Sequence, residues 1–465
     1  MVRLKILHFN DVHSRFEELA KVASAVKELH DANTVVFDAG DNADFARLET
    51  EGTRGVISSA ILNNIGVDAR VFGNNEGFAG EENSRILAEY SACPVVTCNM
   101  YDLNGRKLGY LDDAVIVERS GLKILVIGVT AGDWLNVFYE LSKMHVKDPE
   151  QEIRRVLADY EKSDYDLLIV LSHLSFEKDK EVASRIPGIG VIVGGHSHTV
   201  LERPAVENGV IICQAGGFGE YVGELVLDFD LEKKQIADFQ GRLVSVKDYL
   251  ASPQIMKLIR SYSKEANRNL SRELFLVPVD LGHSLTEENP IGNLLADALK
   301  DFVEAEIGII NSGVLTGGLG KGAVSRKKLH QLLPSPLNPT YMEVRGADLK
   351  ASLEKSLMNE FQISDGSGPG SRTKYLGNLQ VSFNVEVRVN SGKLKTVMIN
   401  DEPLEDDRWY SVGTSDFLQR GTGYSELAYN RNARYRPEFL RDILQTYLQK
   451  KSFLNRAFGK RFSLE

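Results

Sequence analysis

Aspartate, asparagine and histidine side chains follow five short apolar runs of this sequence, each at the point where the run ends. The segments are Asn10-Asp11-Val12-His13, Asp38-Ala39-Gly40-Asp41, Gly73-Asn74-Asn75-Glu76, Ser172-His173 and Gly194-Gly195-His196-Ser197-His198. Imidazoles, carboxylates and an amide, without thiolates, suit divalent Zn, Mn or Fe. Two such ions about 3.5–4 Å apart share a bridging carboxylate, activate a water at neutral pH and clamp phosphoryl oxygens. The pattern therefore predicts a two-metal site capable of phosphoryl chemistry.

Each segment alone is a weak signal. A single histidine such as His173 is more often structural than a metal ligand, and a Gly-Asp pair is a common turn. The combination is more specific, because four of the nine histidines fall in these five segments. The glycines before Asp41, Asn74 and His196 permit tight turns and a close approach of phosphate to the backbone.

The apolar runs alternate with helical patterns over the first half of the chain. Expected strands are Leu4–Phe9, Thr34–Phe37, Val95–Thr97, Leu122–Val129, Leu167–Leu171 and Gly190–Val193, and expected helices are Arg15–His30, Arg54–Asn64 and Pro149–Lys162. This alternation predicts an α/β layered domain. Open α/β sheets bind ligands beyond the carboxyl ends of their strands, so we expect the five segments to converge there.

The composition is that of an ordinary globular protein and excludes several other classes. Of 465 residues, 43% are hydrophobic and 26% charged, and the formal net charge is −10. An acidic chain without a long Lys/Arg run is not expected to bind nucleic acid polymers. No apolar run approaches the ~20 residues that span a bilayer, so no membrane association is expected.

The cysteines and the first residues indicate a compartment. Cys93, Cys98 and Cys213 cannot all pair within one chain and form no CxxC motif, so we expect free thiols in a reducing environment. The chain enters alternating apolar sequence directly after Met1, without the pattern of a secretory signal. We therefore expect a cytoplasmic protein.

The chain is expected to form two domains joined by a helix. Residues 1–246 make up the α/β domain, residues 247–270 a largely polar linker helix, and residues 271–465 the second domain. The second half restarts with the strand-like Leu274–Leu281, followed by a helix at Ile291–Val303 and a strand at Ile307–Asn311.

The five segments together resemble the signature of the calcineurin-like metallophosphoesterases. The second half resembles the C-terminal substrate domain of the 5′-nucleotidase family, and that likeness rests on the segments Glu288–Ala298, Ile310–Gly313, Thr414–Phe417 and Gly421–Tyr424. Together the two halves cover nearly the whole chain. The resemblance implies an N-terminal αββα sandwich and a second, α+β substrate-binding domain.

The resemblance also implies a ligand set. One ion is expected to be held by Asp11, His13, Asp41 and His198. The other is expected to be held by Asp41, Asn74, His173 and His196, with Asp41 bridging the two. The cofactors expected are two divalent ions, Mn, Zn or Fe.

A nucleotide site is implied in the second half. Tyr424 resembles the aromatic residue that stacks on the base in this family, although a tyrosine beside glycine turns is about as often a packing residue. Asn311 and Gly313 belong to a matching substrate-domain motif, and Tyr375 is the nearest candidate for a second stacking aromatic.

The sequence departs from the family at three positions. The family motif Gly-Asn-His-Glu-Phe-Asp contains a His-Asp dyad, but here Asn75 occupies the His position and Phe78 the Asp position. Asn75 can donate a hydrogen bond but no proton, and general acid help is typically worth ~10²–10⁴ in rate. An arginine that helps to hold the nucleotide is replaced by Thr316. Because the general acid is missing, diester or pyrophosphate substrates are expected over simple alkyl monoesters.

Two hypotheses follow from these residues. The first is a dimetal hydrolase that cleaves phosphoester bonds of nucleotides or nucleotide-derived small molecules, with a hydroxide that bridges the two ions as nucleophile and Asp41 and Asn75 as catalytic residues. The alternative is a metal- and nucleotide-binding sensor or scaffold with little turnover, suggested by the missing dyad. Retention of all seven ligand positions favours hydrolysis. For Glu76, an orienting role and a solvated carboxylate are both open.

Overall fold

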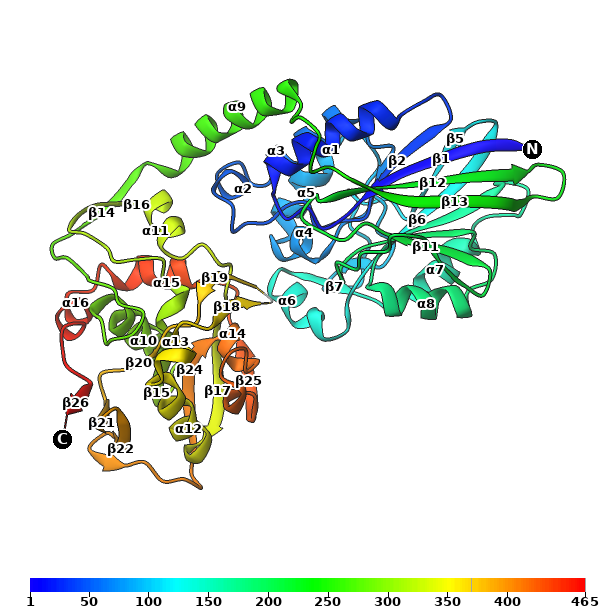
Figure 1. Ribbon diagram of the computed structural model, residues 1–465. Helices are drawn as coiled ribbons and strands as arrows, with labels where there is room; N and C mark the ends of the chain where they lie inside the picture. Colours follow the sequence, from blue (N-terminus) through cyan, green and yellow to red (C-terminus); the bar gives the residue numbers. More distant parts are fainter. Residues whose placement is uncertain (369, 465) are drawn as a thin grey trace. The chain divides into compact units, whose positions relative to one another are not determined.

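The computed structural model describes residues 1–368 and 370–464 and divides into two units, Met1–Ala266 and Asn267–Glu465 (Figure 1). Each unit has a hydrophobic core of its own. All five predicted ligand segments belong to the first unit.

The first unit contains a five-stranded sheet with the order β13-β12-β1-β2-β3. Its strands are β1 (Val2–Phe9), β2 (Thr34–Asp38), β3 (Ala69–Arg70), β12 (Tyr221–Asp230) and β13 (Gln235–Ser245). β1, β2 and β3 pair in parallel, so their carboxyl ends lie at one edge of the sheet.

A six-stranded sheet has the order β10-β11-β9-β8-β6-β5. Its strands are β5 (Ala114–Arg119), β6 (Leu122–Thr130), β8 (Leu167–His173), β9 (Val191–Gly194), β10 (Ala205–Glu207) and β11 (Val210–Gln214). β6, β8, β9 and β11 are parallel neighbours. β8 and β9 are buried along their whole length, as nearly continuous apolar runs require in a covered parallel sheet.

The two sheets pack face to face and helices cover their outer faces. Leu4 and Ile6 of β1 share one apolar cluster with Ile124 and Ile169 of the other sheet. The covering helices are α1 (Phe16–Leu29) and α3 (Val56–Ile65) on the first sheet, and α7 (Pro149–Leu157) and α8 (Phe176–Arg185) on the second. This arrangement confirms the predicted αββα sandwich.

Local sequence signals explain where these helices begin. Asp148 caps α7 by accepting the N–H of Gln151 at 2.8 Å, and Pro149 stands at the first helical position.

The expected strand over Val95–Thr97 is reduced to two isolated bridges, Val95 with Arg70 and Val96 with Asp112. Pro94 directly precedes the first bridge and removes one backbone donor.

The helix between the two halves is shorter than the expected segment 247–270. α9 (Pro253–Leu270) begins six residues later, and its first half packs on the first unit through Ile255 and Ile259. Residues up to Ala266 belong to that unit. The apolar residues at the start of the helix therefore attach it to the sandwich.

The second unit is α+β. Its larger sheet, β20-β15-β24-β17-β25, consists of β15 (Ile307–Asn311), β17 (Pro339–Arg345), β20 (Leu379–Val381), β24 (Trp409–Ser415) and β25 (Asn430–Tyr435). A smaller sheet, β23-β22-β21-β26, consists of β21 (Val385–Asn390), β22 (Lys393–Ile399), β23 (Glu402–Pro403) and β26 (Phe462–Leu464). The principal helix, α10 (Pro290–Phe302), is capped by Asn289, which accepts the N–H of Gly292 at 2.9 Å.

The three cysteines are free, as predicted, and Cys98 and Cys213 are buried. Burial raises the pKa of each of these two thiols to about 12, so both are protonated at neutral pH. Among the described residues, no helix combines the length and the apolar character needed to cross a bilayer.

Candidate metal centre

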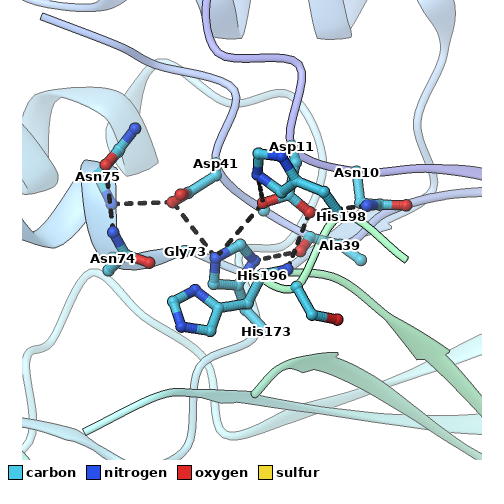
Figure 2. Close-up of polar contacts among 12 residues, drawn as sticks. Asn10, Asp11, Ala39, Asp41, Gly73, Asn74, Asn75, His173, His196 and His198 are labelled. Atoms are coloured by element: carbon cyan, nitrogen blue, oxygen red, sulfur yellow. Dashed lines mark hydrogen bonds and ion pairs between the residues drawn. The ribbon is translucent and has the colours of Figure 1, made fainter. Parts of the chain in front are cut away.

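Five strand ends of the first unit meet where the carboxyl edges of its two sheets adjoin. β1, β2 and β3 are followed by the segments with Asp11 and His13, with Asp41, and with Asn74. β8 ends in His173, and β9 is followed by the turn that carries His196 and His198. Figure 2 shows Asp41, Asp11 and His173 facing one another, with Asn74 and Asn75 to one side.

Asp11, His13 and His198 form the first group of possible ligands. Asp11 Oδ1 lies 3.7 Å from His13 Nε2 and 3.3 Å from His198 Nε2. The two imidazole Nε2 atoms are 3.1 Å apart. Asp11 is completely buried, whereas the His198 side chain is 34% exposed, so this group opens to solvent on the His198 side.

Asp11, Asp41 and His173 form the second group. His173 Nε2 lies 3.5 Å from Asp41 Oδ1 and 3.9 Å from Asp11 Oδ1. The other oxygen of Asp41, Oδ2, lies 3.9 Å from His13 Nε2. The two oxygens of Asp41 thus face different histidines. Asp11 is common to both groups, whereas the resemblance assigned it to one ion.

The remaining two predicted ligands lie beside these groups. The His196 ring packs against that of His173 with the centroids 5.1 Å apart, and its backbone N–H donates to Asp11 Oδ2 at 2.8 Å. The Asn74 amide donates to Asn75 Oδ1 at 3.2 Å, which leaves its own oxygen unengaged.

The residues present fit a pair of divalent ions. Three buried polar atoms of the predicted ligands have no hydrogen-bond partner within the described part of the chain: Asp11 Oδ1, Asn74 Oδ1 and His173 Nε2. Unsatisfied buried groups are rare because each one costs free energy, and unfilled coordination sites are a recognised reason for them. A carboxylate, an amide oxygen and an imidazole nitrogen are the donor types that Zn, Mn and Fe accept.

Hydrogen bonds orient the ligands for this purpose. His173 Nδ1 donates to the carbonyl of Ala39 at 2.8 Å, which leaves Nε2 to face the two carboxylates. Asp11 Oδ2 accepts from the Asn10 amide at 2.7 Å as well as from the His196 backbone, which leaves Oδ1 to face the histidines. Asn10 was not predicted as a site residue. Its position directly before the ligand Asp11 is the signal that could have indicated it.

The carboxylates and imidazoles of the site shift one another's pKa values. Burial alone would lower the pKa of His173, but the carboxylates of Asp41 and Asp11 raise it to about 10. Burial would likewise lower the pKa of His13, and Asp11, Asp41 and Asp44 raise it instead. Burial and the nearby His173 lower the pKa of His196 to about 4, so His196 is neutral and its lone pair is available. Because ligands must shed their protons, His173 and His13 would release theirs on binding metal.

The ligand backbone is strained. Asp11, His13, Asp41, His196 and His198 all have positive φ, between 48° and 76°, although none is a glycine. Such a conformation costs on the order of 1–3 kcal/mol at each residue and persists only where the surroundings impose it. Five ligands with positive φ in one site indicate that the turns after the strands direct these side chains toward one another.

Glu76 is the main site residue whose role the sequence left open. It is fully buried, and its carboxylate accepts four backbone N–H groups: Asp41 (3.1 Å), Asn42 (2.7 Å), Ala43 (2.9 Å) and Gly73 (3.0 Å). Burial and the charge of Asp41 raise its pKa, and buried Arg70 lies 3.8 Å away. Its position three residues after Gly73 is the spacing of a capping box, which is the signal that could have excluded a solvated carboxylate.

Asn75 and Phe78 occupy the two dyad positions on α4 (Asn74–Phe78). The backbone N–H of Asn75 donates to Asp41 Oδ1 at 2.8 Å, and its side-chain nitrogen lies 2.9 Å from His13 Nδ1. Phe78 instead packs on Tyr139, with ring centroids 4.9 Å apart. Asn75 is therefore at the metal centre, while Phe78 has become part of an aromatic cluster.

The substrate-domain motif residues come together in the second unit, but mostly as packing residues. Tyr424 is completely buried, and its hydroxyl donates to the carbonyl of Gly377 at 2.8 Å, so its ring has no free face for a base. The stacking role implied for Tyr424 would require this ring to become exposed. Burial also raises the pKa of its hydroxyl.

Asn311 and Gly313 support the same segment. The Asn311 amide donates to the carbonyl of Leu376 at 2.7 Å, and a Cβ at Gly313 would lie 1.9 Å from the Tyr375 carbonyl oxygen. Both residues are buried, and their implied contact with substrate stays a prediction. Tyr375, at the end of β19 (Ser371–Tyr375), is half-buried, and the Lys374 ammonium lies 4.9 Å from the centroid of its ring.

Comparison with known proteins places both halves. Residues 4–200 match the family model of calcineurin-like phosphoesterases, and residues 275–428 match the 5′-nucleotidase C-terminal domain. The metallophosphoesterase YunD of Bacillus subtilis is 29% identical over 457 residues, which cover 95% of this chain and 98% of that protein. A 5′-nucleotidase of Diplobatis ommata is 25% identical over 504 residues, covering 93% of this chain and 85% of that protein. The solved structure of Haemophilus influenzae NAD nucleotidase has a similar fold, with a TM-score of 0.69 at 19% identity, covering 100% of this chain and 99% of that one.

Proposed function

The chain belongs to the metal-dependent calcineurin-like phosphoesterases that carry a 5′-nucleotidase C-terminal domain, and from this premise we propose that it hydrolyses phosphoester bonds of nucleotides or nucleotide-derived small molecules at two divalent ions. The observation that carries the proposal is the convergence of Asp11 Oδ1, Asn74 Oδ1 and His173 Nε2 at strand ends that also deliver four further ligands. These three buried atoms have no hydrogen-bond partner among the residues that the structure describes.

The two groups of side chains define how the ions would be held. His13 and His198 would face one ion and His173 the other, with Asp41 between them because its two oxygens face His13 and His173. Asn74 and His196 would complete the second ion. When bound, two such ions supply an activated water at neutral pH and a clamp on phosphoryl oxygens.

Two protein groups beside this centre have different roles: one holds the ligand segments in place, and the other faces the substrate. Glu76 holds the Asp41 loop against the Gly73 turn through four backbone hydrogen bonds. Asn75 stands beside His13 and can donate a hydrogen bond to a substrate oxygen, but it has no proton to give to a leaving group. This supports a preference for esters whose leaving group departs as an anion, such as phosphoanhydrides and activated diesters.

Nucleotides are the substrate class that the second domain supports. Proteins with the same two domains include a 5′-nucleotidase and an NAD nucleotidase. Tyr375 is the accessible aromatic among the motif residues and would stack on the base. The native ions would be Mn, Zn or Fe.

Asp41→Asn tests the two-metal mechanism directly. The variant keeps the shape of the side chain but lacks the bridging charge, so we expect loss of at least one bound ion and of phosphatase turnover. Bound metal is measured by elemental analysis, and turnover with p-nitrophenyl phosphate and Mn²⁺. Asp228→Asn, an exposed position paired with Arg3, is the matched control. Full activity in Asp41→Asn would refute the mechanism.

A sensor or scaffold with little turnover is the competing function, and Asn75 is the observation behind it. A panel of nucleoside monophosphates, cyclic nucleotides, dinucleotides and nucleotide-sugars with Mn²⁺ separates the two. Release of phosphate or nucleotide above the metal-free control supports hydrolysis, and its absence across the panel supports the sensor.

A further inference from the structure

Phe218 lies at the rim of the metal centre in an unfavourable backbone conformation. Its φ is 58°, a region that bulky residues rarely adopt, and its side chain is 40% exposed. The conformation is held by a hydrogen bond from the Phe218 N–H to the carbonyl of the ligand Asp11 at 2.7 Å. The neighbouring Gly217 packs against the His198 ring, where a Cβ would lie 3.1 Å from the imidazole. An exposed aromatic is thus fixed in place by the metal centre itself.

The Phe218 ring contacts two metal ligands. Its centroid lies 5.0 Å from that of His198, in an edge-on arrangement with an interplanar angle of 90°. It lies 5.6 Å from that of His13, with an angle of 42°. Because His198 is 34% exposed while Asp11 is completely buried, Phe218 lies on the solvent-facing side of the ligand groups.

Arg15 lies over the same ring. Its guanidinium carbon is 5.6 Å from the Phe218 centroid, and the residue is exposed. Within residues 1–368 and 370–464, the Arg15 guanidinium has no hydrogen bond or ion pair with a protein group. Its charge is therefore available to a ligand, and the Phe218 ring lies on one side of it within the range of a cation–π interaction.

Arg47, a second arginine of the same unit, also lies near an aromatic ring but has carboxylate partners. Arg47 lies over Phe16 at the same 5.6 Å, but it is paired with Glu17 at 2.9 Å and Glu49 at 2.7 Å. Its charge is neutralised within the protein. The pairing of Glu17 with Arg47 also removes one carboxylate near Arg15 that could have neutralised it. Arg15 and Arg47 lie at the same distance from an aromatic ring and differ in their partners.

We propose that Arg15, stacked on Phe218, binds a second phosphate group of the substrate, adjacent to the one held at the metals. This rests on the proposed function and deepens it, since it selects nucleoside diphosphates and related phosphoanhydrides. Guanidinium presents several donors in a planar fork that matches phosphate oxygens. In such a substrate, water would attack the phosphorus of the phosphate group held beside Asp11, Asp41 and His173, and the P–O bond to the second phosphate would break. The electron pair leaves with that phosphate, and one proton of the water passes to solvent. Arg15 stabilises the charge that the leaving phosphate acquires, which suits a site whose Asn75 cannot protonate it.

The test compares substrates with one and two phosphates. In Arg15→Gln, kcat/KM for ADP is expected to fall at least about tenfold, as the loss of a charge-assisted hydrogen bond predicts, while kcat/KM for p-nitrophenyl phosphate stays within about twofold. Phe218→Leu should lower the value for ADP by a smaller factor, because Arg15 loses its platform. Arg3→Gln, an exposed arginine near the opposite end of β1, is the control and should leave both substrates unchanged. An equal fall for both substrates in Arg15→Gln, or no fall for either, overturns the proposal.

A binding measurement separates this proposal from the proposed function. Calorimetric titration of the Mn²⁺-loaded protein with inorganic pyrophosphate should show about tenfold weaker binding in Arg15→Gln than in the wild type, with orthophosphate binding unchanged. If the wild type hydrolyses no substrate but shows this difference, the hydrolase proposal fails and the Arg15 subsite stands. If hydrolysis occurs and pyrophosphate binds both proteins equally, the subsite is wrong and the hydrolase stands.

Discussion

The carboxylate of Glu76 accepts the backbone N–H of Asp41 at 3.1 Å, and it accepts three more backbone N–H groups from the same two turns. One buried side chain thereby joins the loop that carries Asp41 to the turn that carries Asn74. Four donors around one carboxylate leave no room for a neutral substitute, since a glutamine would point an NH₂ group at some of them.

Glu76→Gln should therefore weaken metal binding although Glu76 holds no metal. Loss of groups that orient ligands typically costs 10–100-fold in metal affinity, and we expect a loss of about that size. Unpaired buried N–H groups should also lower the free energy of unfolding by about 1–3 kcal/mol. Competition with a fluorescent chelator measures the affinity, and urea denaturation the stability.

The control for this substitution is Glu82→Gln, on the helix that follows. Glu82 is 69% exposed and pairs with Arg54 at 3.0 Å, so its loss should change neither quantity measurably. Wild-type metal affinity in Glu76→Gln would show that the four hydrogen bonds do not position the ligands.

Asn75→His should raise the rate of hydrolysis of alkyl phosphomonoesters. Asn75 lies 2.9 Å from His13 and its backbone is bonded to Asp41, so an imidazole there would stand at the metal centre and could protonate a leaving oxygen. General acid catalysis is typically worth ~10²–10⁴, and an increase of about tenfold or more in kcat for glycerol phosphate is expected from an acid that lacks its Asp partner. Steady-state phosphate release measures it, with Asn104→His on an exposed turn as the control. A rate that is unchanged or lower would mean that Asn75 does not stand where an acid can act.

The convergence of the ligands could be predicted because it depends on short-range patterns. β2, β8 and β9 are fully buried runs typical of a covered parallel sheet, β1 pairs in parallel with β2, and parallel strands place their carboxyl ends at one edge. Asp11, Asp41 and His173 follow from that rule alone. The sandwich itself follows from the same runs and the helices between them.

The failures concern burial, which is a property of the tertiary fold. A carboxylate such as Glu76 looks the same in a sequence whether it meets water or four backbone N–H groups. A motif likewise gives the position of Tyr424 but not the exposure of its ring, and in the structure that ring is completely buried. The start of α9 at Pro253 depends on Ile255 and Ile259 meeting the first core, a contact between segments far apart in sequence.

Asp179 should make the first domain less stable as pH rises. It is fully buried on α8 and accepts a hydrogen bond from the Ser172 hydroxyl, and its other oxygen has no hydrogen-bond partner among the described residues. Burial raises its pKa to about 8, from an ordinary value of about 3.8 for an exposed aspartate. Between these two values the folded state keeps a proton that the unfolded state has lost, so the free energy of unfolding falls as pH rises through this window, by up to about 1.4 kcal/mol per pH unit.

Asp179→Asn removes that proton exchange while keeping the shape of the side chain. The difference in unfolding free energy between variant and wild type should move in favour of the variant from pH 5 to pH 8, as measured by urea denaturation of the metal-free protein. Asp159→Asn, on the surface, should show no such trend. Parallel pH profiles for Asp179→Asn and the wild type would mean that Asp179 titrates alike in both states.

Substitutions of Tyr375 and Tyr424 should have different effects, because we expect Tyr375 to contact the substrate and Tyr424 to stabilise the fold. Stacking on a base is worth about 1–3 kcal/mol, so Tyr375→Ala should raise KM for AMP by about fivefold or more and leave glycerol phosphate, which has no base, unchanged. Tyr424→Leu removes a buried ring and its hydrogen bond to Gly377, so the free energy of unfolding should fall by about 2–3 kcal/mol. KM for AMP should nevertheless stay at the wild-type value, because a completely buried ring cannot meet a base. A selective rise in KM for AMP in Tyr424→Leu would show that this ring becomes exposed when substrate binds. The split between KM and stability thus decides which tyrosine recognises the base.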